Sequence, residues 1–514
     1  MGLVVPAIFV ENKIYLSGIK KLAGQTMWYG VSSIAARFIN YLLTPYLTNV
    51  LSIADYGKMS LVYAAIPFFN VIFTFGFETA YFRFSQGKEN ENTVYSTASL
   101  SLFFSTLTLG CILWFFQGSL ATFAGIPDYP HLIQLSIVII IFDTLTTLPF
   151  ARLRHEGRPI KYAFIRIFSI VINIASTIFF ISICPKLLAS NPNHWIGIIY
   201  DPTANPVTYI VIANVIQSGI TLLLFLPDIG AIRLKFDSKL WQAMMLYSLP
   251  LIVAGMGGMI NETFDRIMLR WWVPGDVLFK EEQVGIYNAC YKLSILISLF
   301  IQAFRMGAEP FFFKQAQSDN PQKTYARVMK FFVITVSIMF LVVSLFIPIW
   351  RYFIAQKHWG GLGVVPILLM ANIFLGIYYN LSIWYKLSNK TLSGAYITLV
   401  GAAITLVINA VFIRWYSFMA CAWATFFCYG SMMVISFVWG QKEYRIPYAW
   451  KKLLAYLTIS VTIFFIHKGI TSLFPNVFFN IGLALILLFV YVRFILFVEK
   501  KEFQKLPVIG KYIK

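Results

Sequence analysis

Charged residues are scarce in this sequence. Asp, Glu, Lys and Arg together make up 12% of the 514 residues, whereas 59% are hydrophobic. An ordinary soluble domain is about 25% charged and about 45–50% apolar. A chain of this composition has more apolar side chains than a water-facing surface can hide. A soluble globular protein is therefore excluded, and the mean hydropathy of +0.73 is typical of a polytopic membrane protein.

Cysteine and histidine are also rare. The five cysteines all lie inside apolar runs, at spacings that fit neither a zinc site nor a disulfide framework. The five histidines are scattered, without an HExxH motif or another paired-ligand spacing. No GxxxxGK[ST] phosphate loop is present. We therefore expect no metal site, no cofactor and no ATPase, and any transport would draw on an ion gradient (H⁺ or Na⁺), the membrane potential or the substrate's own gradient.

Long apolar runs fill most of the chain, and runs of about 18 or more residues predict membrane-spanning helices. Fourteen are present, of which 453–467 is the weakest because it needs flanking residues to cross a bilayer about 30 Å thick. No segment between them is long enough to form a domain, which argues against a polysaccharide polymerase, a ligase or another membrane enzyme. The predicted spans are 24–49, 58–82, 94–117, 131–150, 162–184, 207–226, 241–273, 284–308, 329–350, 363–386, 394–413, 419–439, 453–467 and 477–497.

The sequence contains 41 Lys and Arg against 21 Asp and Glu, a net charge of +20. Most of these bases lie between apolar runs, and alternate segments, beginning with the N-terminal one, carry the larger share. This pattern orients membrane helices and predicts that both termini are cytoplasmic, so the charge implies no nucleic-acid partner. The first ten residues lack a basic region and a cleavage site. We expect no signal peptide, and a start codon placed too early explains these residues equally well.

Ionisable residues inside the predicted spans are the candidate functional residues, because a charge in the membrane either faces a water-filled cavity or pairs with another group. Arg37 lies near the middle of the first span. Two interpretations of it stay open, namely a structural pair with a carboxylate on another helix and contact with a substrate.

The seventh span carries the densest group of polar residues, in the segment NETFDRIMLRWW that begins at Asn261. Glu262 and Arg266 are four residues apart, which favours an intrahelical ion pair, and Arg270 continues the same face. Arginine suits phosphate because its planar guanidinium donates two parallel hydrogen bonds and stays charged when desolvated. For Arg270 we favour a simpler interpretation, a wet helix end beside two tryptophans.

Other spans carry single embedded charges. A buried carboxylate can titrate near neutral pH, because desolvation disfavours its charged form. The candidates for ion coupling or charge balance are therefore Glu78, Asp143, Glu262 and Asp265. Lys292 is a further embedded cation, and Arg83, Arg305 and Glu309 are candidates for an inner gate.

The two halves of the chain echo one another weakly. Gly57 follows Arg37 by twenty residues in the first half, and Gly285 follows Arg266 by nineteen in the second. Such halves are typical of transporters built from two repeats about a central site.

Five segments, in matching order over about two thirds of the chain, resemble the polysaccharide-biosynthesis (Wzx-type) flippases of the multidrug/oligosaccharidyl-lipid/polysaccharide exporter (MOP) superfamily. The DYG turn, the DR pair and the VGIY turn within them are fairly specific in combination. The segments are LTPYLTNVLSIADYGKMSLVYA (43–64), FGFETAYFRFSQG (75–87), ARLRHEGRPIKYAFIR (151–166), INETFDRIML (260–269) and VGIYNACYKLSILISLFIQAFRMGAEPFF (284–312).

The resemblance implies an all-α bundle of two six-helix lobes around a central cavity, plus two C-terminal helices, in the bacterial inner membrane. On this chain the parts would be an N-terminal segment (1–23), an N-lobe (24–226), a linker (227–240), a C-lobe (241–439), two further helices (440–497) and a basic tail (498–514).

The resemblance also implies a function. Members of the family move undecaprenyl-diphosphate-linked oligosaccharides between leaflets by alternating access, for O-antigen, capsule or exopolysaccharide assembly with polymerase and assembly proteins. The cationic cavity role would fall on Arg37, Arg266, Lys292 and Arg270, with Glu78, Glu262 and Asp265 balancing the charge or coupling transport to an ion.

An ion-coupled drug or metabolite exporter of the same fold stays open as an alternative. A lipid II flippase is a weaker one, because the first span lacks the Arg-Asp pattern of those proteins.

Overall fold

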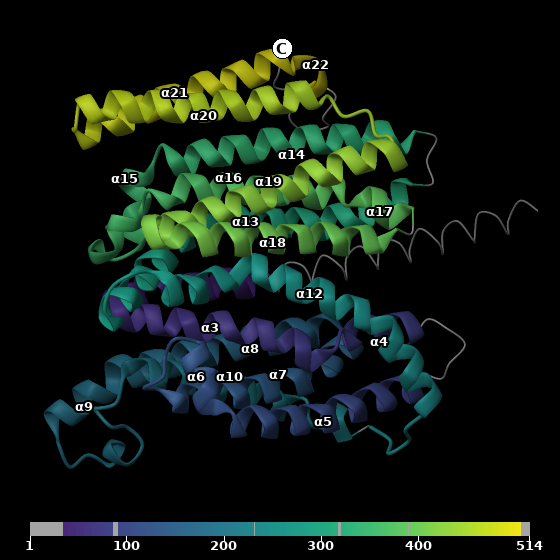
Figure 1. Ribbon diagram of the computed structural model, residues 1–514, viewed down its shortest axis with the longest axis vertical. Helices are drawn as coiled ribbons and strands as arrows, with labels where there is room; N and C mark the ends of the chain where they lie inside the picture. Colours follow the sequence, from purple (N-terminus) through teal and green to yellow (C-terminus); the bar gives the residue numbers. More distant parts are fainter. Residues whose placement is uncertain (1–33, 86–90, 231, 317–319, 389, 505–514) are drawn as a thin grey trace, which may run out of the picture. The chain divides into compact units, whose positions relative to one another are not determined.

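The protein is an all-helical polytopic membrane protein, as predicted. The computed structural model describes residues 34–85, 91–230, 232–316, 320–388 and 390–504 (Figure 1). Within these ranges the regular secondary structure is helical, and thirteen helices are long and apolar enough to cross a membrane. The remaining predicted span, 24–49, lies partly outside the described residues, and its described part is helical.

Some helices extend beyond the predicted apolar runs at one or both ends, because polar residues continue them, whereas others end a few residues earlier than predicted. The weakest prediction, 453–467, is a full helix of 24 residues, α20 (Trp450–Leu473), and takes in residues from both flanks. At 1.5 Å per residue a helix of this length covers the hydrocarbon thickness of a bilayer.

The chain divides into two compact units, residues 1–285 with 302–308, and residues 286–301 with 309–514. The long helix α13 (Val277–Gln315) contributes to both. The other helices of the first unit are α2 (Leu43–Val50), α3 (Ile53–Thr74), α4 (Phe77–Ser85), α5 (Glu91–Phe115), α6 (Gln117–Phe123), α7 (Pro130–His155), α8 (Pro159–Ile178), α9 (Cys184–Ser190), α10 (Pro206–Leu224), α11 (Leu226–Gly230) and α12 (Ser238–Trp272).

In the first unit α10 packs on α7 and α8, and α12 packs on α3 and α4. A cluster of buried aromatic residues, including Phe77, Tyr81 and Tyr95, joins α4 and α5 to Met244 of α12. The helix that follows the predicted linker 227–240 therefore packs within this unit. The lobe boundaries given above stay a prediction.

The second unit is built around α16, which packs on α14 and α19. Buried Trp384 and Tyr429 belong to the core where α17, α18 and α19 meet. Its helices besides α13 are α14 (Pro321–Ser344), α15 (Ile347–Trp350), α16 (Val364–Leu381), α17 (Ile383–Leu387), α18 (Thr391–Tyr416), α19 (Phe418–Glu443), α20 (Trp450–Leu473), α21 (Val477–Val498) and α22 (Lys500–Phe503).

Several predicted helices are interrupted, and two of the breaks have a clear local cause. The span predicted over 58–82 breaks between α3 and α4, where Phe75 and Gly76 have φ angles of 51° and 70°. Glycine adopts this left-handed conformation without strain, whereas phenylalanine does not. The span predicted over 162–184 passes from α8 through a π-helical turn, Phe179–Ile183, into α9, with Pro185 at the start of α9. Proline cannot donate a backbone hydrogen bond, which accounts for the irregular turn before it.

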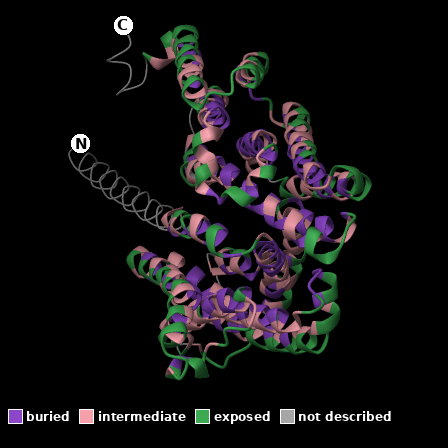
Figure 2. Ribbon diagram, turned by 90° about the vertical axis from the view of Figure 1, so that its left-hand side faces the viewer, coloured by how far each residue is buried: buried purple, intermediate pink, exposed green. Residues whose placement is uncertain are grey.

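The α20–α21 hairpin is attached to the second unit by a buried carboxylate just after α21. Few residues of α21 are buried, namely Ala484, Tyr491 and Ile495, and the helix next to the C-terminus in Figure 2 is largely green and pink. Glu499 accepts hydrogen bonds from Lys330 Nζ (3.1 Å), Tyr456 Oη (2.6 Å) and Lys452 Nζ (2.7 Å). Burial alone would raise the pKa of Glu499, but these three donors outweigh burial and hold it below its ordinary value.

Replacing Glu499 with Gln should lower the free energy of unfolding at neutral pH by about 1.5–3 kcal/mol, the worth of hydrogen bonds to a charged group. A carboxyl group whose pKa is lower in the folded state stabilises the fold above its unfolded pKa of about 4.3. The difference from wild type should therefore shrink as the pH falls below that value. Thermal unfolding of the purified protein across this pH range measures it.

Glu443→Gln is the matched control, because the side chains of Glu443 and its partner Lys390 are more exposed and such pairs contribute little. Equal effects of the two variants at neutral pH would contradict the role of Glu499.

Candidate functional site

The polar stretch of α12 is largely buried within the first unit. Asn261, Asp265 and Arg266 are buried, whereas the side chain of Glu262 is exposed. Arg266 Nη1 donates to Asp265 Oδ1 at 3.1 Å and to the backbone carbonyl of Glu262 at 2.8 Å. The ion pair that we predict between Glu262 and Arg266 is thus replaced by one between Asp265 and Arg266. The carboxylate of Glu262 is left facing outward.

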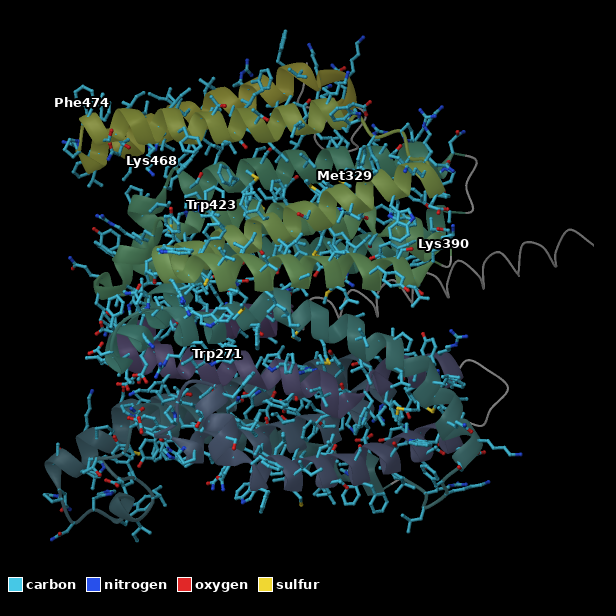
Figure 3. The ribbon with its side chains drawn as sticks, in the orientation of Figure 1. Trp271, Met329, Lys390, Trp423, Lys468 and Phe474 are labelled. Carbon is cyan, nitrogen blue, oxygen red and sulfur yellow. The ribbon has the colours of Figure 1, made fainter. Side chains whose placement is uncertain are left out.

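Arg270 lies one turn further along α12, and the expectation of a wet helix end is wrong for it. The residue is 8% exposed. The loop between α6 and α7 covers it so closely that a Cβ atom at Gly125 would lie 2.3 Å from its Cγ. The neighbouring Trp271, labelled in Figure 3, donates from its indole nitrogen to the carbonyl of Phe123 at 2.7 Å. A loop that is distant in sequence therefore buries this end of α12.

A group of charged residues that we call the Lys58 cluster lies at the start of α3. Lys58 Nζ is 3.3 Å from Asp55 Oδ1, 3.6 Å from Glu281 Oε2 and 3.3 Å from Tyr129 Oη. Asp55 also accepts from the side chain of Asn205 at 2.7 Å. Lys58 and Glu281 are 9% and 4% exposed. The cluster ties the starts of α3 and α13 to the loops before α7 and α10.

The cluster surrounds a crossing of α3 and α13 at two glycines. A Cβ atom at Gly57 would lie 2.0 Å from the carbonyl oxygen of Glu281, and one at Gly285 would lie 2.2 Å from that of Ile53. Each such atom would also come within about 3.2 Å of the other glycine's nitrogen. Only glycine at both positions allows the two backbones to approach this closely.

Gly57 and Gly285 are the residues that mark the echo between the two halves of the sequence. The structure brings these corresponding positions into direct contact. The acidic and basic residues beside them, Asp55, Lys58 and Glu281, were not among the sequence-predicted site residues. Asp55 and Lys58 lie in and directly after the DYG motif, and Glu281 lies three residues before the VGIY motif. Their closeness to the paired glycines is the signal that could have identified them, although both motifs are helical and do not form the turns expected from the sequence.

Arg37 differs from the arginines of α12 because its side chain is exposed. In the described part of the chain, its guanidinium donates to the side-chain oxygen of Gln302. A neutral amide does not cancel the arginine's charge. One of the two interpretations left open for Arg37 was a structural pair with a carboxylate on another helix. Among the described residues the structure shows no such ion pair.

The sequence-predicted residues of α4 and α7 each have a partner on another helix. Glu78 is ion-paired with Arg154 of α7, and Asp143 accepts from the hydroxyl of Ser218 on α10 at 2.7 Å. Arg83 lies over the ring of Tyr247, 4.4 Å from its centroid. The structure therefore distributes these charges over separate helix contacts and does not gather them into one site.

Three candidates lie on α13. Lys292 is half-buried, and Arg305 is exposed. Glu309 is ion-paired with Lys386 of α17 within the second unit. Among the described residues, no group of three or more His, Cys, Asp or Glu side chains could hold a metal ion.

Comparison with known proteins relates the chain to a family and to a fold. The family described as "Polysaccharide biosynthesis protein" matches residues 22–316. An uncharacterized membrane protein of Haemophilus influenzae is 20% identical over 361 residues, which cover 68% of this chain and 80% of the relative.

Solved transporter structures share the fold. The lipid II flippase MurJ, in an inward closed conformation, aligns over 92% of this chain and 99% of its own, with a TM-score of 0.64 and 14% identity. The MATE transporter VcmN of Vibrio cholerae aligns over 82% and 96%, with a TM-score of 0.51 and 11% identity. The predicted fold is thereby confirmed, since the chain shares it with these solved transporter structures.

The glycine crossing makes a stability prediction. Gly57→Ala and Gly285→Ala should each lower the unfolding midpoint, because the added methyl group overlaps a backbone carbonyl and overpacking costs about 1–3 kcal/mol. Gly258→Ala on α12 is the control, since a Cβ atom there meets no other atom within 4 Å. Thermal unfolding of the three purified variants tests this, and midpoints at the wild-type value for both crossing variants would contradict the packing.

Proposed function

The chain belongs to the polysaccharide biosynthesis protein family, and on this premise we propose that it moves undecaprenyl-diphosphate-linked oligosaccharides across the bacterial inner membrane by alternating access. The product would supply surface polysaccharide assembly, as O antigen, capsule or exopolysaccharide, together with polymerase and assembly proteins. Both termini lie in the cytoplasm in this proposal. The family and the transporter fold support it.

The observation that carries the proposal is the exposed guanidinium of Arg37. Its position in a predicted span rules out a lipid-facing charge on energetic grounds, so that we place it in a water-filled cavity. Its partner Gln302 is neutral, which leaves the positive charge available to an anion. A guanidinium binds phosphate through two parallel hydrogen bonds, and the interaction is strong where the dielectric constant is low. A diphosphate is the anion that the family's substrates carry.

The buried arginines of α12 have a different role in this proposal. Arg266 is paired with Asp265, and loop residues cover Arg270. In the conformation described here, we propose that these two arginines hold α12 in place. They would contact the substrate only after the helices move. Glu262 is exposed on the same helix and stays a candidate for charge balance or for coupling to H⁺ or Na⁺.

We assign the Lys58 cluster and the glycine crossing to the closed outer gate. With both termini in the cytoplasm, the starts of α3 and α13 lie at the outer surface. Alternating access requires this end to open, and opening must separate Gly57 from Gly285 and Lys58 from Glu281.

Deleting the gene and quantifying undecaprenyl-diphosphate-linked oligosaccharide by mass spectrometry is the primary test, with leaflet accessibility assayed in spheroplasts. Accumulation in the inner leaflet is the expected result and identifies the glycan. Accumulation of lipid II would favour a lipid II flippase instead. Unchanged lipid-linked pools with increased drug sensitivity would favour the drug exporter, for which the exposed carboxylate of Glu262 is the supporting observation.

Arg37→Ala should reduce surface polysaccharide about 10- to 100-fold at an unchanged protein level, because it removes charge-assisted hydrogen bonds of about 1.5–3 kcal/mol. Arg266→Ala should also abolish it, but this variant leaves the buried carboxylate of Asp265 unpaired, so its folding must be checked. Arg233→Ala is the matched control, because Arg233 is exposed in the same unit on the loop before α12. Normal polysaccharide from Arg37→Ala and Arg266→Ala would reject the cavity assignment.

Charge reversal tests the gate. Lys58→Glu and Glu281→Lys should each lower surface polysaccharide, because removing one partner of a buried ion pair costs about 3–5 kcal/mol. Combining the two reversals should restore much of the loss. Lys390→Glu is the control, since its pair with Glu443 is solvent-accessible and contributes little. A double variant no better than the single ones would exclude the pair as a gate contact.

A further inference from the structure

A cavity of about 790 Å³ lies within the second unit, between the α20–α21 hairpin and the ends of α14, α16 and α19. Its walls are mainly apolar and include Met370 and Phe374 of α16, Trp423 and Phe426 of α19, and Leu457 of α20. Its volume is in the range of pockets that bind small molecules, about 300–1,000 Å³. Two of the lining residues, Trp423 on α19 and Lys468 on α20, are labelled in Figure 3.

One end of the cavity is polar. The lining there includes Ser344 at the end of α14, Lys468 and Thr471 of α20, and Asn480 of α21. The rings of Phe340 and Phe464 lie 6.1 Å apart. Ser344 and Lys468 each follow one of these rings by four residues, about one helical turn. The N-terminal halves of α14 and α20 both reach Glu499, so the two helices run in the same direction, and Ser344 and Lys468 lie at about the same level.

The polar end is built for an anion. Ser344 is 3% exposed, and its hydroxyl has no hydrogen-bond partner among the described residues. A buried hydroxyl group without a partner is unfavourable and indicates a missing one. Lys468 supplies a positive charge, and no Asp or Glu lines the cavity in the described part of the chain.

The hairpin meets the rest of its unit partly through direct contacts and partly across the cavity. At the Glu499 end, side chains bridge the helices directly, and Tyr491 Oη also donates to Ser337 of α14 at 2.8 Å. The cavity lies between the hairpin and the ends of α14, α16 and α19, and its lining follows α20 from Leu454 to Thr471. An apolar cavity of this size is costly when empty, because its lining atoms lose dispersion contacts. Water does not fill it well, since water needs polar partners.

We propose that a membrane glycerophospholipid occupies this cavity. An acyl chain lies along the aromatic wall, and the phosphate meets Lys468 and the hydroxyl of Ser344. A single lysine matches a single phosphate, whereas a diphosphate would call for more cationic donors. The lipid is a resident part of the fold that fills the space between hairpin and bundle, so this site does not depend on the proposed transport function.

Native mass spectrometry of the full chain, purified in detergent and supplied with phosphatidylglycerol, tests the site. Wild type should retain one phospholipid, and added phosphatidylglycerol should raise its unfolding temperature, because a ligand that binds the folded state stabilises it. Lys468→Ala should lower the occupancy about tenfold, as expected for loss of a charge-assisted contact. Ser344→Ala should lower it less, and Lys468→Arg should keep most of it.

Lys451→Ala is the matched control, an exposed lysine at the opposite end of α20, and it should bind as wild type. Absence of retained phospholipid together with no thermal shift would overturn the proposal. Equal occupancy in Lys468→Ala and Lys451→Ala would overturn it as well. Retention of a polyprenyl diphosphate in place of phospholipid would reassign the cavity to the transported lipid.

Discussion

Charge and backbone polarity are both expensive in hydrocarbon, and this constraint shapes the whole molecule. Helices satisfy their own backbone groups, which is why the described chain is helical throughout its spans. The ionisable side chains then need partners or water. Glu78 with Arg154, Asp265 with Arg266, and Glu309 with Lys386 are local solutions to this problem. Arg37 lies in a predicted span, and its described side-chain partner, Gln302, is neutral. We therefore look for function first at Arg37.

Paired charges do more than neutralise one another in this protein. Glu499 gathers two lysines and a tyrosine from α14 and α20 and so fixes a helix hairpin to its unit. The Lys58 cluster joins two helix starts to two loops. Because both groups lie at helix ends, the apolar interior of each helix is left to pack by shape. The α20–α21 hairpin shows the result, since side chains bridge it to α14 at Glu499, whereas a mainly apolar cavity lies along α20.

Much of the fold could be predicted from the sequence, because membrane helices are encoded by composition over twenty or so residues. Even the short run 453–467 marks a complete helix, α20. The ends of helices and the break at Phe75 depend on single residues and were not predicted. The burial of Arg270 could not be predicted either, because a loop about 145 residues earlier in the chain covers it. Asp55, Lys58 and Glu281 were overlooked for a related reason, since charges near helix starts are ordinary until a fold brings them together.

At the crossing of Gly57 and Gly285 the two helices approach through their backbones. Such a surface can separate without any side chain first changing its rotamer, so its resistance to separation comes mainly from the electrostatic cluster beside it. That resistance falls as soon as water enters, because a higher dielectric constant weakens the attraction between Lys58 and Glu281. If the crossing opens as proposed, separation would promote itself once begun, and intermediate openings would be the least stable arrangements. A contact of this kind would have two stable states, closed and open, and no stable intermediate between them.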